Sequence, residues 1–258
     1  MTGYDADPKH LQTALERGAL DATAASAQAT AESCEVLVLA TPVDAVVELL
    51  GQLRAHPPQA QLILDVASLK VPVARAAAGL DAFVATHPIA GSERSGPEQA
   101  RADLFEGCAW TYDPLGAPAA VERAQAFITS MGARPVPLPS AVHDEVAALT
   151  SHLPQVLAVA LAGRLGAAAD ANTLALCGTG MRSMTRLGSS SWAMWEGILS
   201  ANGPAVAQEV RRLSAILAEI ADELETNRSQ ALRSRFAAAA TASAGLTAPR
   251  NDSPPESR

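Results

Sequence analysis

The 258-residue sequence has few aromatic residues and few cysteines, and each scarcity excludes a class of protein. Aromatic residues make up 3% of the chain, which favours close-packed helices over an aromatic-rich β-sandwich. The three cysteines are odd in number, far apart and without the spacing of metal ligands; they are Cys34, Cys108 and Cys177. We therefore expect no metal site, and a reducing cytoplasm in which each thiol behaves as a small apolar side chain.

The chain also lacks clustered positive charge, long apolar runs and a secretion signal. With a formal net charge of −8 and no basic cluster, it is not expected to bind nucleic acid. No uninterrupted apolar run is long enough to span a bilayer, and the N-terminus lacks the basic-then-apolar order of a secretion signal. We expect a cytoplasmic protein with no membrane partner.

What the sequence does contain is a change of periodicity near residue 139. Before it, apolar runs at residues 35–40 and 61–67 flank a helical pattern that begins after Pro42. Continuous runs of Val, Leu and Ile are typical of strands buried on both faces. The strand–helix–strand repetition predicts right-handed crossovers and a parallel, doubly wound sheet.

After residue 139 the patterns are helical. Residues 141–165 form an Ala/Leu/Val-rich stretch that Pro154 should kink. A second helix is predicted over 204–226, with apolar residues every three or four positions, which fit either a core within the chain or a dimer seam. The composition of residues 239–258 predicts a disordered tail. The predicted domains are thus 1–139 and 140–238.

The start of the chain resembles the end of a strand followed by a helix with Asp7 as N-cap and Pro8 as its first residue. An acidic residue at a strand tip is how dinucleotide-binding folds hold ribose hydroxyls, and Asp5 fits that position. A carboxylate there would repel the extra phosphate of NADP. No Gly-x-Gly-x-x-Gly segment and no first strand precede Asp5. We therefore expect an N-terminally truncated Rossmann-like sheet with an uncovered central edge and an upstream segment that supplies the rest; the alternative is a protein that holds a pyrophosphate in another way.

His87 is the leading candidate for catalysis. It follows the apolar run 82–85 and opens a loop rich in small and polar residues. The carboxyl end of a buried strand is where open α/β sheets place ligand chemistry, and an imidazole can accept a proton near neutral pH.

Several segments together carry a resemblance to a known family. They are Gly3-Tyr4-Asp5, Asp65-Val-Ala-Ser-Leu-Lys70, His87-Pro-Ile-Ala-Gly-Ser-Glu-Arg-Ser-Gly96, Ser151-His-Leu-Pro154, and Met184-Thr-Arg186 with Met194-Trp195. Through them the sequence resembles the prephenate/arogenate dehydrogenases of tyrosine biosynthesis. The resemblance implies an α/β fold, with a Rossmann-like parallel sheet followed by an all-α dimerisation domain. It also implies oxidation and decarboxylation of a cyclohexadienol, with hydride transfer to NAD or NADP; we expect NAD, prephenate and a homodimer formed through the helical domain.

The resemblance also implies roles for individual residues. His87 matches the catalytic histidine, and Ser68 matches a serine that hydrogen-bonds both the histidine and the ring hydroxyl. Arg186 matches an arginine that binds the substrate carboxylate, and Glu93 an acidic residue near the pocket mouth. The remaining expected contacts are His152 and Gln155 with substrate, and Asp5, Thr41, Pro42 and Ser68 with cofactor.

Most of these residues also have a structural interpretation. Ser68 could cap the helix that begins near Lys70, Arg186 could pair with a surface acid, and His152 is equally consistent with a core histidine. Lys70 is expected to be solvated, with a contact to a phosphate or carboxylate as the alternative. His143 and Asp144 are expected to be solvated, and Trp195 to serve packing.

Three alternatives in function stay open. Many prephenate-specific members have a second histidine where this chain has Gln155, which leaves arogenate as an alternative substrate. The missing glycine loop leaves a catalytically impaired or purely dimerising fragment as another. A β-hydroxyacid dehydrogenase would normally need a catalytic lysine on the long helix, and residues 141–165 contain none.

Overall fold

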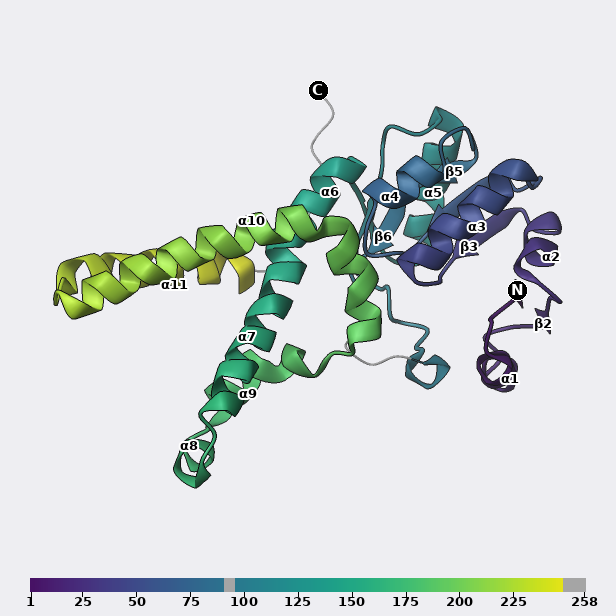
Figure 1. The fold of residues 1–258 in the computed structure, drawn as a ribbon. Coiled ribbons are helices and arrows are strands. Elements are labelled where there is room, and N and C mark those ends of the chain that lie inside the picture. Colours follow the sequence, from purple (N-terminus) through teal and green to yellow (C-terminus); the bar gives the residue numbers. More distant parts are fainter. Residues whose placement is uncertain (91–95, 248–258) are drawn as a thin grey trace. The chain divides into compact units, whose positions relative to one another are not determined.

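A computed structural model describes residues 1–90 and 96–247 of the chain (Figure 1). The chain forms two compact units, Met1–Ala207 and Gln208–Arg258. The first unit contains every described strand and the candidate site. Glu93 and residues 248–258 lie outside the described residues.

The strands of the first unit form three small sheets. β1 pairs in parallel with β2, and β3, β4 and β5 form a parallel sheet in that order. In the third sheet β6 is antiparallel to β7, and β7 is parallel to β8. The strands are β1 Thr2–Gly3, β2 Ala22–Thr23, β3 Val36–Leu39, β4 Leu62–Asp65, β5 Phe83–Val84, β6 Thr86–Pro88, β7 Ala109–Tyr112 and β8 Arg134–Pro137.

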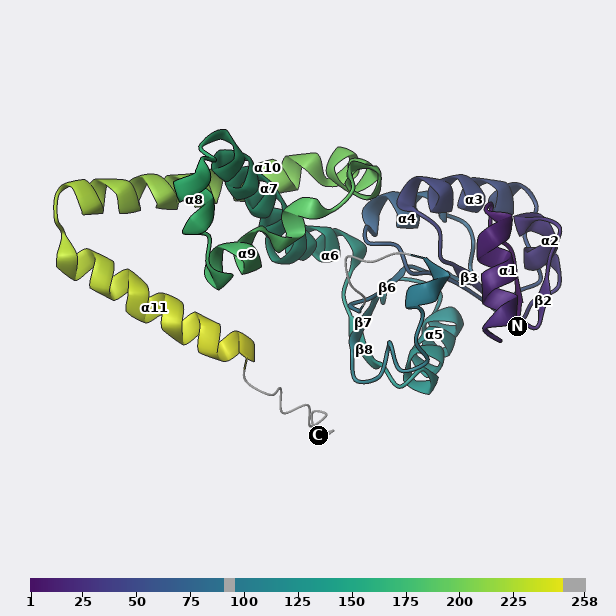
Figure 2. The same cartoon turned by 90° about the horizontal axis from the view of Figure 1, so that it is seen from below.

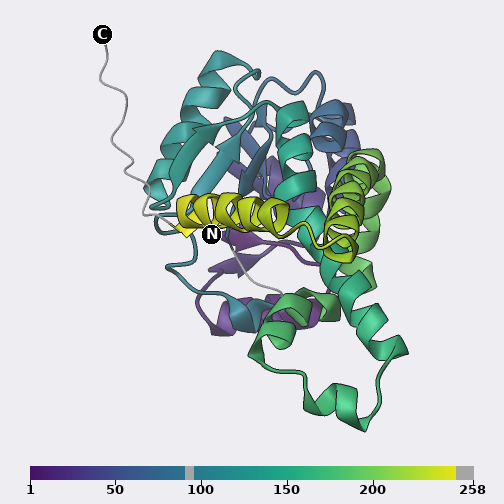
Figure 3. The same cartoon turned by 90° about the vertical axis from the view of Figure 1, so that its left-hand side faces the viewer.

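Helices cover both faces of these strands, as expected for a doubly wound fold. Figures 2 and 3 show the strands between α5 on one face and α3 and α4 on the other. The helices of this part are α1 Pro8–Glu16, α2 Ala27–Glu32, α3 Val43–Ala55, α4 Val71–Ala76, the 3₁₀ turn η1 Pro97–Gln99 and α5 Pro118–Ser130. The predicted Rossmann-like architecture is confirmed.

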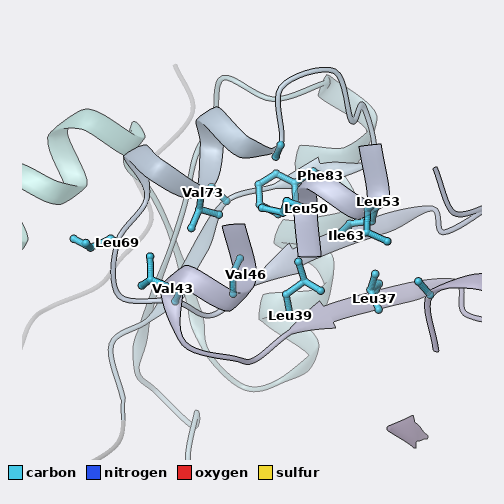
Figure 4. Packing of buried hydrophobic residues seen from close by; sticks show 14 of the residues in the cluster. Leu37, Leu39, Val43, Val46, Leu50, Leu53, Ile63, Leu69, Val73 and Phe83 are labelled. Atoms are coloured by element: carbon cyan, nitrogen blue, oxygen red, sulfur yellow. The ribbon is translucent and has the colours of Figure 1, made fainter. Parts of the chain in front are cut away.

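Two apolar clusters hold the layers together. On the α3 side, Val46 and Leu50 are fully buried against Ile63 of β4, and Figure 4 shows this packing. Apolar positions of α3 recur every three or four residues, so one stripe of the helix faces the strands. On the α5 side, Trp110 of β7 packs with Ile128 in a second cluster.

One edge of β3 has no strand partner among the described residues. β3 pairs only with β4, and the β1–β2 pair forms a separate sheet. Val36 and Val38, which alternate with buried leucines, are 40% and 41% exposed. The uncovered edge expected from the sequence therefore lies at β3.

The predicted long helix is continuous but contains a wide turn. It consists of α6 Ser140–Ala147, the π-helical turn η2 Ala148–His152 and α7 Leu153–Ala167. Because Pro154 has no amide hydrogen to donate, the break in regular helix falls just before it, as a π turn. The stretch Ser140–Ala167 is long and apolar enough to cross a membrane by length and composition, which differs from the sequence expectation. It also carries buried polar side chains that bond within the protein.

Two predictions for the later helices are wrong. Pro204 lies inside a longer helix, α10 Trp192–Glu225, and does not begin it. α11 Ser229–Thr247 is helical across part of the predicted disordered tail, because alanine-rich sequence has high helix propensity. The remaining helices are α8 Ala171–Ala175, α9 Thr179–Thr185 and the 3₁₀ turn η3 Arg186–Ser189.

The second unit contains the end of α10 together with α11. Arg235 of α11 donates hydrogen bonds to Glu219 and Glu223 of α10, at 2.6 and 2.9 Å. Asn227 adopts a left-handed conformation, with φ of 52°, in the turn between the two helices.

Candidate active site

His87 lies in β6, opposite Thr111 of β7. The sequence led us to expect it at the start of a loop; instead it is a strand residue at the junction between the parallel sheet and the antiparallel pair. Its Nδ1 is 3.0 Å from Nε2 of His143, and the two rings meet edge to face with centroids 5.2 Å apart. Strand pairing on one side and the second imidazole on the other hold the ring in place.

The environment of His87 keeps its imidazole neutral. Burial lowers its pKa from 6.5 to about 3, and the positive charge of Lys70 and the imidazoles of His143 and His152 add to the shift. At neutral pH the ring therefore has a free lone pair and can accept a proton.

Beneath His87, a buried ion pair joins β4 to β6. Asp65, at the end of β4, is completely buried and accepts hydrogen bonds from the amides of Thr86 and Ala67, both at 3.0 Å. Lys70 donates to the Asp65 carboxylate and to the Thr86 carbonyl. The expectation that Lys70 is solvated is wrong, since it is 2% exposed; a carboxylate inside the fold requires a cation beside it.

Asp144 reaches from α6 to the start of α4. Its two carboxylate oxygens accept the amides of Lys70 and Val71 at 2.8 and 2.9 Å. It therefore caps α4, and the alternative that Ser68 does so is wrong. His143 and Asp144 were expected to be solvated; they are 3% and 5% exposed.

His152 lies in the π-helical turn η2, which directly follows α6, and its side chain is buried. Its Nδ1 is 3.2 Å from Nδ2 of Asn202, which also donates to the Asp144 carbonyl at 2.8 Å. Burial lowers the pKa of His152 to about 4. The ring of Trp195 meets it edge to face at 5.8 Å, so Trp195 does pack as expected. The Trp195 indole N–H is buried with no hydrogen-bond partner among the described residues.

Gln155 connects α7 to the turn that carries Arg186. Its Nε2 donates to the Leu187 carbonyl at 2.8 Å, and its Oε1 accepts from Ser190 at 3.3 Å. Gly188 allows this close approach, because a Cβ there would lie 3.2 Å from the Ala158 carbonyl oxygen. Arg186 itself is exposed on η3. The described contacts do not bring it to His87.

The expected cofactor residues are exposed near the ends of strands. Asp5 follows β1 and accepts the Asp7 amide at 2.8 Å. Asp7 caps α1 and Pro8 is its first residue, as predicted. Thr41 and Pro42 are exposed between β3 and α3, and Ser68 is half-buried after β4.

Sequence reasoning missed the contribution of α6 to the site. Its buried positions are Ser140, His143, Asp144 and Ala147. They are spaced three, one and three residues apart, which is the spacing of one helix face, and three of the four are polar. A polar face of this kind on an otherwise apolar helix was the signal that could have revealed it.

The depressed histidine pKa values predict that the protein loses stability in mild acid. The unfolded chain binds protons on His87 and His152 as the pH falls below 6.5, whereas the folded protein does so only near 3 and 4. Stability is therefore complete above pH 6.5 and declines toward pH 4. We expect urea unfolding to give a free energy up to about 5 kcal/mol lower at pH 4.5 than at pH 7, about 2.5 kcal/mol from each histidine. His152→Gln should reduce this difference and the exposed His56→Gln should not; equal stability at both pH values would contradict the prediction.

Comparison with known proteins gives consistent matches over both parts of the chain. The family model described as prephenate dehydrogenase, nucleotide-binding domain, matches residues 1–136, and the model described as prephenate dehydrogenase, dimerization domain, matches residues 139–238. A probable prephenate dehydrogenase, NovF of Streptomyces niveus, is 33% identical over 78% of this chain and 57% of its own length. The chain spans 57–64% of the length of the curated relatives it matches.

Solved structures show the same fold. Prephenate dehydrogenase from A. aeolicus, in complex with hydroxyphenyl propionate and NAD+, has a TM-score of 0.87 at 22% identity, over 95% of this chain and 88% of that one. Synechocystis arogenate dehydrogenase has a TM-score of 0.79 at 21% identity, over 95% and 91% of the two chains.

Proposed function

Because this chain belongs to the prephenate dehydrogenase family, we propose that it catalyses the oxidative decarboxylation of prephenate to 4-hydroxyphenylpyruvate. The observation that carries the proposal is the buried, neutral His87, held by a second imidazole and close to the polar face of α6. Removal of a hydroxyl proton needs an unprotonated acceptor, and a neutral imidazole is one.

His87 takes the proton of the ring C4 hydroxyl as the C4 hydride leaves. The C4–O bond becomes a carbonyl. The bond from the ring to its carboxylate then breaks as carbon dioxide departs, and its electron pair moves through the ring onto the C4 oxygen, which makes the ring an aromatic phenolate. The proton held by His87 returns to that oxygen and gives the hydroxyl of the product. Ser68, half-buried after β4, orients the hydroxyl. Arg186 binds a substrate carboxylate, since a guanidinium offers two parallel donors and a permanent charge.

The residues present fit the two ends of NAD. The exposed Asp5 suits the adenosine ribose and disfavours the extra phosphate of NADP, while Thr41, Pro42 and Ser68 follow strands β3 and β4. NAD, when bound, supplies the hydride acceptor.

Residues 1–258 contain no Gly-x-Gly-x-x-Gly segment, the turn that usually holds the pyrophosphate at a helix N-terminus. We accordingly expect weak binding in a calorimetric titration of this chain with NAD, and tight binding would contradict this. Failure to bind NAD at any concentration would favour the impaired fragment.

Arogenate is the second candidate substrate, because Gln155 stands where many prephenate-specific members have a second histidine. Its amide bonds to the Leu187 carbonyl of η3 and to the Ser190 hydroxyl just after that turn. NADH formation measured with each pure substrate at saturating NAD tests both functions. No NADH from either would refute the proposal.

Arg186→Ala should raise the KM for the ring substrate about 10- to 100-fold, with a smaller effect on kcat. The reason is the loss of a charge-assisted contact to a carboxylate, which contributes about 1.5–3 kcal/mol. Steady-state kinetics measure this, with the exposed Arg211→Ala as the matched control. An unchanged KM would remove Arg186 from substrate binding.

We further propose a cytoplasmic homodimer formed through the helical domain. Apolar side chains at Val142, Val146 and Leu149 are 42–53% exposed on one side of α6 and η2, and Val159 of α7 is 52% exposed. Uncovered apolar surface of this kind marks an interface. Light scattering should give twice the 26.5 kDa chain mass, and Val146→Glu should shift the protein toward monomer; a monomeric parent protein would contradict the proposal.

A further inference from the structure

We infer that His143 and Asp144 are positioning residues that set the tautomer of His87, leaving its Nε2 as the base. This rests on the proposed function of His87 and adds two residues that the family resemblance did not assign. The geometry is a line of three groups: Asp144 Oδ1 is 2.8 Å from His143 Nδ1, and His143 Nε2 is 3.0 Å from His87 Nδ1.

The donor and acceptor roles follow from the Asp144 carboxylate. An ionised carboxylate only accepts, so His143 Nδ1 must carry its proton. In the neutral ring His143 Nε2 is then an acceptor, and His87 Nδ1 must donate to it. The proton of neutral His87 is thus on Nδ1, and its Nε2 has the lone pair.

Asp144 is itself fixed in place. Oδ1 also accepts the Lys70 amide and Oδ2 accepts the Val71 amide, so both oxygens are oriented by the first turn of α4. The Asp144 carbonyl accepts from Asn202 of α10 at 2.8 Å. α6 is therefore held on both sides, and the line of groups forms before any substrate arrives.

On proton transfer His87 acquires a positive charge that its buried surroundings disfavour. After proton transfer from the substrate hydroxyl to Nε2, His87 is an imidazolium that still donates from Nδ1 to His143. The negative charge of the Asp144 carboxylate, one ring away, partly offsets the cost of the new positive charge. Among the described residues, Lys70 also lies near His87, and its ammonium is paired with Asp65.

Nitrogen-15 NMR of the histidine rings tests the inference without substrate or cofactor. In the 258-residue protein at neutral pH, we expect His87 to show a protonated Nδ1 and a bare Nε2, with its signals assigned by their loss in His87→Asn. His143→Phe keeps an aromatic ring but removes the acceptor, and should change the tautomer of His87. His143→Gln can place an amide oxygen near the former Nε2 and should restore the Nδ1–H form.

Kinetics give the second readout. His143→Phe should lower kcat about 10- to 1,000-fold with little change in substrate KM, because the base is present in the wrong tautomer. His143→Gln should recover most of kcat, and the exposed His56→Phe should match the parent protein. A protonated Nε2 on His87 in the parent protein, or an unchanged tautomer in His143→Phe, would overturn the inference. If the parent protein forms no NADH, the proposed function fails, whereas the NMR result still decides the tautomer.

Discussion

Replacing His87 with asparagine is expected to lower turnover about 10²- to 10⁴-fold, the usual contribution of a general base. The asparagine amide lies near the position of the imidazole Nδ1, so the contact with His143 at 3.0 Å can be kept while Nε2 is removed. The substitution therefore deletes the proton acceptor and leaves the surrounding bonds. Substrate KM should change little.

NADH formation under saturating NAD and substrate measures this effect. His56→Asn is the matched control, because His56 is exposed beyond the end of α3. An unfolding curve like that of the parent protein should accompany the lost activity of His87→Asn. Turnover near that of the parent protein would show that another group removes the proton.

Replacing Lys70 with methionine is expected to lower the free energy of unfolding by about 3–5 kcal/mol. The substitution leaves the fully buried Asp65 carboxylate without its cation and the Thr86 carbonyl without one donor. Burial lowers the pKa of Lys70, and the charge of Asp65 is the main opposing influence. Each charge of the pair therefore offsets the desolvation of the other. Removing Lys70 leaves the full desolvation cost of the Asp65 carboxylate.

Urea unfolding at pH 7 measures this loss. The control is Arg101→Met, which breaks a pair with Asp103 whose side chains are 66% and 57% exposed. Exposed pairs contribute less than about 1 kcal/mol, so the two variants should differ clearly. A loss below 1 kcal/mol for Lys70→Met would mean that Asp65 becomes protonated or rehydrated at little cost.

Local patterns predicted the elements of this protein well. The runs at 35–40 and 61–67 became β3 and β4, and the spacing of Val46 and Leu50 correctly gave the buried stripe of α3. Asp7 and Pro8 predicted the start of α1. Apolar periodicity and capping act within a few residues of the chain, so a single sequence contains the information they need.

Most of what the sequence predicted about the environment of the candidate site was wrong. Lys70, His143 and Asp144 have polar side chains in or near first turns of helices, where solvent exposure is the usual outcome. Asp144 instead bonds to amides 74 and 73 positions earlier in the chain, and His143 to a ring 56 positions away. A pattern of neighbouring residues does not reveal contacts between residues so far apart in the sequence.

The sequence by itself predicted the alternation of strands and helices and singled out the candidate base, because these depend on short-range periodicity and on motifs of neighbouring residues. Only the tertiary structure decided which groups surround His87, what caps α4 and which charges are buried. These depend on side chains that α6 and β6 bring together, and a buried polar group must find its partner wherever the fold places one.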